Sequence, residues 1–310
     1  METGEFVLMT DHSSTEGSRD ILAEAVEALT GSPPVLVDAR RFMTGGDGQA
    51  RTVEGRLQLS LPGADRAVWP SAVLIFEIPP HRRRHLVAFQ RRLRELGARS
   101  LGLDDQAWKV ATEKDLMVER FARDGIPQMD TLTLSGASQQ ECVDAFERLG
   151  RDVWARPVVG MGGRDVFHIT THEQLHEAAR FYQDAGQGWL IARDAGNFTP
   201  AGQRTQFRVL VLHGQVLQAH ERLQPDPDAP CNIAQGATTT AVLAPNELPA
   251  GLGELAVRAT KSLGLPFGGV DLAPQNGGVV FEVNVHPAFN PVHPVESIAI
   301  PYVQAHLDLL

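Results

Sequence analysis

The strongest constraint on the fold is the segment GGVDLAPQNGGVVFEVNV at 268–285, which consists of two apolar runs joined by QNGG. Asn and Gly at such a junction are typical of a β-hairpin, which places the two runs side by side as strands. Alternate side chains of a strand share a face, so Glu282 and Asn284 are expected on one face and Phe281 on the opposite, packed face. The hairpin then brings Asp271 beside Glu282.

Asp271, Glu282 and Asn284 together offer oxygen donors on neighbouring strands. Carboxylate and amide oxygens are the ligands that hard divalent cations such as Mg²⁺ prefer, and nucleotide phosphates often complete the coordination. The segment therefore points to a magnesium–nucleotide site. Taken alone, the pattern is more typical of a half-exposed hairpin with a solvated polar face. Other parts of the chain must therefore distinguish a metal site from a solvated hairpin.

Composition narrows the class of protein. The chain has 310 residues, of which 43% are apolar and 21% charged, which indicates a globular protein of two or three compact units. The net charge of -10 argues against a nucleic-acid-binding protein. Two cysteines in no metal-binding spacing favour a reducing, cytoplasmic compartment. The acidic start does not resemble a signal peptide, and no apolar run reaches membrane-spanning length, so no membrane association is expected.

The first hundred residues alternate between strand and helix patterns. Strands are predicted at 6–10, 34–39 and 71–78, and helices at 21–30 and 81–97. Such alternation is typical of an open α/β unit.

After residue 110 the pattern changes to fewer helices and more strands. A helix is predicted over 112–127, with Thr112 as its N-terminal cap and Gly125 near its end. The other predicted elements are strands on both sides of a glycine loop at 152–169, a helix at 172–186, a strand at 188–196, two strands around the turn at 213–214, and a helix at 254–264.

A phosphate site is suggested by the glycine-rich loop in RPVVGMGGRDV. Gly160, Gly162 and Gly163 would let backbone N–H groups approach phosphate oxygens closely. Lys114 and Arg156 add positive charge before the loop. Loops of this kind are at least as often plain turns, so the loop alone is a weak signal.

Arg208 and Arg222 lie in the two strands around the turn at 213–214, with the spacing of a polar face. Guanidinium groups in such positions bind phosphoryl or carboxylate oxygens, or they form the solvated edge of a sheet. The residues alone leave both interpretations open.

Taken in order, the lysine-bearing helix, the basic glycine loop, FRVLVLHGQVLQAHERL, NIAQG and GVDL followed by FEVN resemble the ATP-grasp superfamily. The resemblance is closest to the RimK-like carboxylate–amine ligases and spans roughly residues 70–290. It implies an α/β (α+β) fold in which an N-terminal open α/β domain, 1–105, precedes two antiparallel-sheet domains that clamp ATP. These are a central lid subdomain, 106–190, and a C-terminal subdomain with the metal site, 191–310.

The resemblance also implies a role for each candidate residue. The implied assignments are Lys114 and Arg156 for the nucleotide phosphates; Gly160, Gly162 and Gly163 for a mobile flap over them; Leu190, Ile191 and Arg193 for the hinge strand at adenine; Arg208 and Arg222 as the catalytic arginines that face the acyl phosphate and the γ-phosphate; and Asp271, Glu282 and Asn284 as magnesium ligands.

The implied activity is that of an ADP-forming ligase. Such an enzyme uses ATP and Mg²⁺, or Mn²⁺ in its place, to activate a carboxylate as an acyl phosphate and joins it to the amine of an amino acid or peptide. A homodimer or homotetramer is expected by the same resemblance. The alternatives are a macrocycle-forming ligase that modifies a ribosomal peptide, a non-catalytic nucleotide-binding regulatory protein, and a phosphotransferase on the same fold. No local motif identifies the acyl donor or the amine.

The chain departs from the family pattern in several places. Arg156 stands where a lysine is usual, which replaces a point charge by a planar fork. Gln206 stands where an acid often precedes the arginine, and NIAQGA and NVHPAF replace NHRGG-like and NxSPG-like segments. Because the metal residues and both late arginines are intact, an active enzyme with an unusual substrate is favoured over an inactive one. His286 and His293, which follow the metal strand, are expected to be structural rather than catalytic.

Overall fold

The computed structural model describes residues 4–63, 66–289 and 294–309. Within these ranges the chain divides into two compact units. One comprises Met1–Lys109 together with His286–Leu310, and the other comprises Val110–Val285. The expected division of the second unit near residue 190 stays a prediction.

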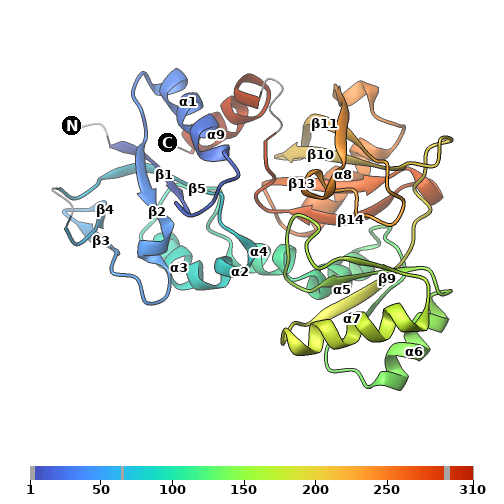
Figure 1. Ribbon diagram of the computed structural model, residues 1–310. Coiled ribbons are helices and arrows are strands. Elements are labelled where there is room, and N and C mark those ends of the chain that lie inside the picture. Colours follow the sequence, from blue (N-terminus) through green and yellow to red (C-terminus); the bar gives the residue numbers. More distant parts are fainter. Residues whose placement is uncertain (1–3, 64–65, 290–293, 310) are drawn as a thin grey trace. The chain divides into compact units, whose positions relative to one another are not determined.

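The first unit contains a parallel sheet with strand order β2-β1-β5 (Figure 1). Its strands are β1 Glu5–Thr10, β2 Val35–Asp38 and β5 Pro70–Phe76, and α1 Ser18–Thr30 connects the first two. The apolar runs of β1 and β5 are buried almost throughout, as is typical of central strands in a parallel sheet. A separate antiparallel hairpin consists of β3 Gln49–Val53 and β4 Arg56–Ser60. The predicted open α/β unit is confirmed.

The end of the chain packs with this first unit, whereas it was predicted to belong to the C-terminal subdomain, 191–310. The π-helical turn η6, Val295–Ala299, and α9, Ile300–Leu307, both contact α1, and α9 also contacts β5. The ring of Phe76 in β5 lies 5.2 Å from that of Phe289 and 5.6 Å from that of Tyr302. Because no helix was predicted after residue 264, this apolar packing could not be anticipated.

Two helix predictions need correction. The helix predicted at 81–97 is interrupted, since the structure has α2 Pro80–Arg83, the 3₁₀ turn η2 Arg84–Leu86 and α3 Val87–Glu95. The unpredicted helix α4 Asp105–Thr112 ends where α5 Lys114–Asp124 begins, so Thr112 closes one helix and does not cap the next. Gly125 ends α5 with a left-handed φ of 66°, as predicted.

One sheet of the second unit is antiparallel with the order β6-β9-β7-β8. Its elements are β6 Thr131–Thr133, α6 Gln139–Arg148, β7 Val153–Pro157, β8 Phe167–Ile169, α7 His172–Asp184 and β9 Trp189–Arg193. Capping boxes begin both helices, at Ser138 for α6 and at Thr171 for α7. The apolar faces of the helices and of the sheet share one core, which includes the fully buried Phe146 and Tyr182.

The other sheet of this unit is antiparallel with the order β12-β11-β10-β13-β14. Its strands are β10 Arg204–Leu212, β11 Gln215–Gln224, β12 Thr238–Leu243, β13 Phe267–Ala273 and β14 Val279–Asn284. Helix α8, Leu252–Ser262, contacts four of these strands (Figure 1). The remaining short turns are η1 Ala39–Phe42, η3 Ile233–Gln235, η4 Pro245–Glu247 and η5 Gln275–Gly277.

The predicted hairpin is formed by β13 and β14, with Asp271 opposite Glu282. The register shifts by one residue after this pair, so that Leu272 lies opposite Val280 and Phe281 is the extra residue of a β-bulge. Phe281 consequently lines the cleft described below. This corrects the prediction that Phe281 packs on the opposite face.

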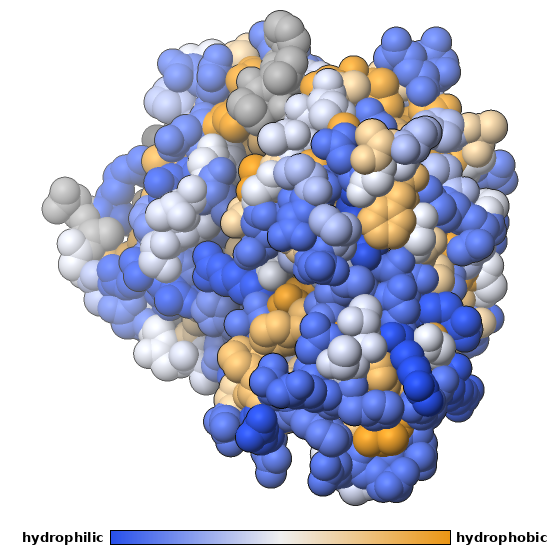
Figure 2. All heavy atoms as spheres, turned by 45° about the vertical axis from the view of Figure 1, so that its right-hand side comes forward, coloured by the Kyte–Doolittle hydropathy of each residue, from blue (hydrophilic) through white to orange (hydrophobic). Residues whose placement is uncertain are grey.

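The face of the molecule in Figure 2 is mostly hydrophilic, and its hydrophobic residues lie in small groups separated by hydrophilic ones. In the described part of the chain, no helix combines the length and apolar character that crossing a membrane requires.

Candidate functional site

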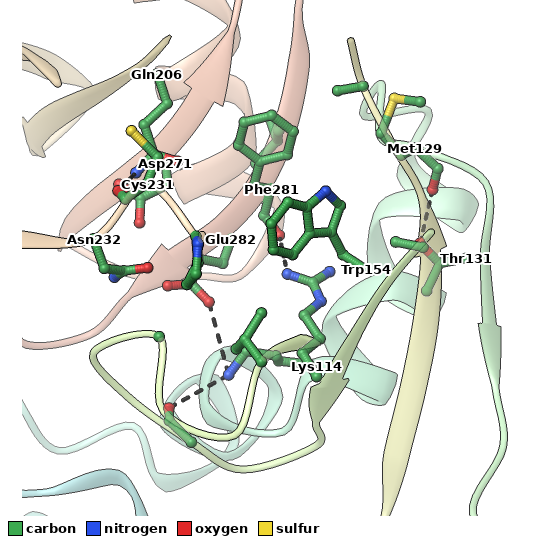
Figure 3. A pocket seen from close by; sticks show the side chains of 18 of the residues that line it. Lys114, Met129, Thr131, Trp154, Gln206, Cys231, Asn232, Asp271, Phe281 and Glu282 are labelled. Carbon is green, nitrogen blue, oxygen red and sulfur yellow. Dashed lines mark hydrogen bonds and ion pairs between the residues drawn. The ribbon is translucent and has the colours of Figure 1, made fainter. Parts of the chain in front are cut away.

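A cleft in the second unit brings together most of the predicted site residues (Figure 3). Predicted residues that line it are Lys114, Arg156, Gly160, Gly162, Gly163, Arg193, Asp271 and Glu282. Lining residues that had no predicted role include Met129, Trp154, Ala192, Arg204, Cys231 and Phe281. The cleft therefore combines cations, a glycine loop, two carboxylates and a set of apolar and aromatic side chains.

Asp271, Glu282 and Asn284 lie together, as the hairpin predicted. The Asn284 amide nitrogen lies 3.4 Å from an oxygen of Asp271 and 3.4 Å from an oxygen of Glu282. An amide group has a donor end and an acceptor end, so turning it over would direct its oxygen toward the same point as the two carboxylates. This donor set fits a hard divalent cation.

Asp271 is buried and held by two arginines. Arg208 donates from Nε and from a terminal nitrogen to the two carboxylate oxygens at 2.5 and 2.6 Å, and Arg222 lies 3.8 Å from one of them. Burial opposes ionisation of Asp271, but the two guanidinium groups outweigh it and lower the pKa of the carboxyl. The carboxylate is therefore charged at neutral pH, as a metal ligand must be.

Arg208 and Arg222 are not among the residues that line the cleft, although Asp271 is. They come from neighbouring strands, since Arg208 is on β10 and Arg222 is on β11. Burial, with a contribution from the nearby Arg208, lowers the pKa of Arg222 to about 10, so its guanidinium is still charged at neutral pH.

Lys114 is the first residue of α5 and points toward Glu282 (Figure 3). Its ammonium nitrogen lies 3.7 Å from a Glu282 oxygen and 3.4 Å from the carbonyl oxygen of Gly160. The lysine therefore connects the glycine loop to the acidic strand, where it can neutralise an anion that enters the cleft.

Arg156, at the end of β7, donates to the carbonyl oxygen of Phe281 at 3.0 Å. Burial lowers the pKa of its guanidinium, and Glu282 opposes that effect only in part. Its Nε–H is buried and has no protein partner among the described residues. A buried donor without a partner is costly, so this position suits a ligand with an acceptor oxygen.

The glycine loop lies against the segment at 230–235. Gly162 and Gly163 have left-handed φ values of +66° and +69°, which other residues adopt only with strain. A Cβ atom on Gly163 would lie 2.9 Å from Oδ1 of Asn232, and Gln235 donates to the carbonyl oxygen of Gly162 at 3.2 Å. Glycine is therefore required at position 163 for this close approach.

Of the three predicted hinge residues, only Arg193 lines the cleft. Leu190 and Ile191 are fully buried in β9, where Leu190 pairs with Arg156 in β7. Arg193 lines the cleft at its rim and forms an ion pair of 3.2 Å with Asp130. Only the last part of β9 thus faces the cleft, and Leu190 and Ile191 contribute backbone and core packing.

The sequence did not predict an aromatic and charged cluster that includes two residues lining the cleft, Trp154 and Arg204. The Arg204 guanidinium lies 4.7 Å from the Trp154 ring and 4.4 Å from the Phe198 ring, and it forms an ion pair of 2.7 Å with Asp194. The Trp154 indole N–H also donates to Asp194, and His168 stacks on the Trp154 ring. The one available signal was that Arg204 continues the alternate polar positions of β10.

His286 has a structural role. Its Nδ1 accepts the N–H of Ile78 at 3.2 Å, and its ring lies 4.7 Å from those of Phe76 and Trp108. Burial and, to a smaller extent, Arg83 hold the pKa of His286 well below its usual value. His293 lies outside the described residues.

Comparisons with known proteins agree with this geometry. The model of the RimK-like ATP-grasp domain matches residues 111–301. A probable alpha-L-glutamate ligase of Legionella pneumophila (strain Corby) is 25% identical over 189 residues, which are 60% of this chain and 59% of the relative. One from Haemophilus influenzae (strain PittEE) is 28% identical over 105 residues, or 34% of each chain. The chain thus spans about three fifths of the length of the first relative.

Many solved structures resemble the whole chain, and two of them illustrate the likeness. The ATP-grasp ligase PsnB, complexed with a minimal precursor, Mg and ADP, has a TM-score of 0.65 at 18% identity and covers 98% of this chain and 97% of its own. The D-cycloserine synthetase DcsG has a TM-score of 0.70 at 17% identity and covers 99% of this chain and 100% of its own. At such low identity these likenesses show the fold alone, and they confirm the predicted ATP-grasp fold.

Proposed function

Because the chain belongs to the RimK-like ATP-grasp family, we propose that it is an ADP-forming ligase that joins a carboxylate to the amine of an amino acid or peptide. ATP and Mg²⁺, for which Mn²⁺ can substitute, are its proposed cofactors. The observation that carries the proposal is the meeting, in one cleft, of the paired carboxylates Asp271 and Glu282 with the cations Lys114 and Arg156.

The nucleotide is proposed to lie along this cleft. Lys114, Arg156 and the backbone of the glycine loop bind its phosphates, and the unpartnered Nε–H of Arg156 gains an acceptor when they do. The base lies toward Met129 and Phe281, near the end of β9. Asp271, Glu282 and Asn284 hold magnesium, which when bound neutralises charge on the phosphates.

The chemistry follows from the poor reactivity of a carboxylate, whose leaving group would be an oxide. An oxygen of the substrate carboxylate bonds to the γ-phosphorus of ATP, the bond from that phosphorus to the β-phosphate oxygen breaks, and ADP leaves. The amine nitrogen then bonds to the acyl carbon, phosphate leaves with the C–O electron pair, and the nitrogen loses one proton. Arg208 and Arg222 hold the phosphoryl and acyl oxygens on which negative charge develops.

Water must be excluded because it would hydrolyse the acyl phosphate. The glycine loop is proposed to cover the phosphates. The hydrogen bond from Gln235 to the carbonyl oxygen of Gly162, which holds the loop to the segment at 230–235, supports this role. Its two left-handed glycines give the loop the backbone freedom that opening and closing require.

The test is release of ADP and phosphate from Mg-ATP with the amino acids offered singly and in pairs, together with mass spectrometry of the products. A ligase releases ADP and phosphate in equal amounts and forms a product that has lost one water relative to its two substrates. Asp271→Asn is expected to abolish this release, and Asp184→Asn, a change of the same kind at an exposed position in α7, is the control.

The other outcomes separate the alternatives. ATP binding without turnover on the amino acids directs the same assay to peptide acceptors. Full turnover by Asp271→Asn would show that the metal assignment is wrong. Formation of ADP without phosphate indicates a phosphotransferase. Absence of ATP turnover with every acceptor favours the non-catalytic interpretation.

A further inference from the structure

Strand β11 carries three buried polar side chains, and the proposed mechanism uses only one of them, Arg222. Gln218, His220 and Arg222 occupy alternate positions and so share one face of the sheet, with relative exposures of 7%, 2% and 8%. Oε1 of Gln218, both ring nitrogens of His220 and Nε of Arg222 have no hydrogen-bond partner in the described part of the protein. None of the three lines the cleft.

These groups lie next to Arg208 and Asp271, where the reaction is proposed to occur. In the register of the sheet His220 lies opposite Arg208, which holds Asp271 through two hydrogen bonds. Arg222 itself lies 3.8 Å from Asp271. The unpartnered groups thus continue the polar face of the sheet from Asp271 along β11.

Burial of polar groups without partners opposes folding, and native proteins contain few such groups. Three neighbouring side chains with unsatisfied atoms on one face therefore mark a place where ordered water or a ligand completes the hydrogen bonds. The ligand must accept a hydrogen bond at Arg222 and donate one at Gln218, because a guanidinium only donates and the unpartnered amide oxygen only accepts.

We propose that Gln218 and His220 form the subsite for the acceptor amine, next to the acyl oxygens held by Arg222. This inference rests on the proposed ligase function. The amine of the second substrate would donate its N–H groups to the Gln218 oxygen and to a His220 nitrogen, and its nitrogen lone pair would face the acyl carbon. The bond changes are those given above, and the departing phosphate takes the proton that the amine loses.

The charge of the subsite suits the free amine rather than the ammonium ion. An amine attacks only through its lone pair, and a carboxylate beside it would stabilise the unreactive ammonium form. Gln218 is uncharged, and burial, with smaller effects of Arg222 and Arg208, lowers the pKa of His220 to about 4, so its ring keeps an acceptor nitrogen at neutral pH. The two arginines also disfavour a positive charge on the bound amine.

Competition between two amines tests the proposal. The wild type, Gln218→Leu and His220→Leu are each given Mg-ATP, an equimolar pool of the twenty amino acids and excess hydroxylamine. Hydroxylamine is small and intercepts the acyl phosphate as a hydroxamate, whereas amides form from amines that use the subsite. We expect both variants to lower the ratio of amide to hydroxamate about tenfold or more, which corresponds to about 1.4 kcal/mol.

Gln215→Leu is the matched control, because it makes the same change at an exposed position of the same strand. Its ratio of amide to hydroxamate should equal that of the wild type. Loss of both products in parallel in Gln218→Leu and His220→Leu would instead place the pair at the acyl substrate or in the fold, and would overturn the proposal. If the wild type forms no hydroxamate with any carboxylate, it is the proposed ligase function that fails.

Thermal unfolding without substrates gives an independent test. Leucine at position 220 removes the unsatisfied ring nitrogens, so His220→Leu is expected to raise the unfolding temperature of the full chain by about 2–4 °C. A lower unfolding temperature in both His220→Leu and Gln218→Leu would mean that these groups are satisfied without a ligand, and would refute the subsite even if no substrate has been found.

Discussion

Replacing Gly163 by alanine tests whether the glycine loop must close on the segment at 230–235 for nucleotide binding. A Cβ atom at this position would lie 2.9 Å from Oδ1 of Asn232, 2.9 Å from Cγ of Gln235 and 3.0 Å from Cγ of Pro230. The first two atoms belong to side chains that can move, but Pro230 is a rigid ring. We expect the loop to lift away from the segment.

The neighbouring glycine supplies the control from which the magnitude follows. Gly162 has a φ of +66°, against +69° for Gly163, so alanine carries a similar backbone strain of about 1–2 kcal/mol at both positions. A Cβ atom on Gly162 would have ordinary contact, 3.8 Å from Ala234. The difference between the two variants is therefore the overlap alone, about 1–3 kcal/mol for an overpacked site.

Calorimetric titration with a non-hydrolysable ATP analogue and Mg²⁺ measures this difference. If binding requires the closed loop, a difference of about 1–3 kcal/mol weakens binding to Gly163→Ala about 5- to 150-fold relative to Gly162→Ala. A loop that lifts away relieves the overlap, so the unfolding temperatures of the two variants should differ little. Equal affinities would refute the reasoning, since the contact at 230–235 would then be irrelevant to the nucleotide.

Three further predictions concern single residues. Asp271→Asn is expected to lower amino-acid-stimulated phosphate release about 100-fold or more, because a neutral amide replaces a charged ligand; unchanged release would remove Asp271 from the metal site. His286→Leu should destabilise the protein by about 1–3 kcal/mol by leaving a buried N–H without a partner. Because the pKa of His286 lies well below its usual 6.5 in the folded protein, the unfolded chain binds more protons as the pH falls below that value. Wild-type stability in urea should therefore decrease toward about pH 5, and this dependence should be weaker in His286→Leu. Arg204→Lys keeps the charge but loses the planar stacking between Trp154 and Phe198, so we expect a loss of about 0.5–2 kcal/mol in urea unfolding, and no loss would show that the stacking is not stabilising.

The sequence predicted best the elements whose signals are local. The apolar runs at 6–10 and 71–78 form β1 and β5, and the turn at 213–214 joins β10 to β11. The helix predicted at 81–97 failed because helical spacing is also satisfied by consecutive short turns, which the structure places at 80–86. Helix α9 was missed because its partners, α1 and β5, are distant in sequence.

The candidate site shows the same limit at the level of side chains. The hairpin and the alternation of strand positions predicted Asp271 and Glu282 together, and they lie opposite each other. The pairing of Arg208 with Asp271 across β10 and β13 was not predicted. Nothing in the spacing of Trp154 and Arg204 indicates that they stack, since they come from different sheets of the second unit. Such contacts depend on how the two sheets approach each other.

The bulge at Phe281 shows how one residue changes the composition of the cleft. Strict alternation along β14 would turn Phe281 away from Glu282 and leave that side of the cleft without its ring. The extra residue of the bulge keeps Glu282 opposite Asp271, yet it also brings an aromatic ring to the cleft, and the Phe281 carbonyl accepts the hydrogen bond from Arg156. A carbonyl that is left out of the strand ladder is free to accept a side-chain donor. The same irregularity therefore supplies both the aromatic side chain and the oriented cation that the proposed nucleotide site would use.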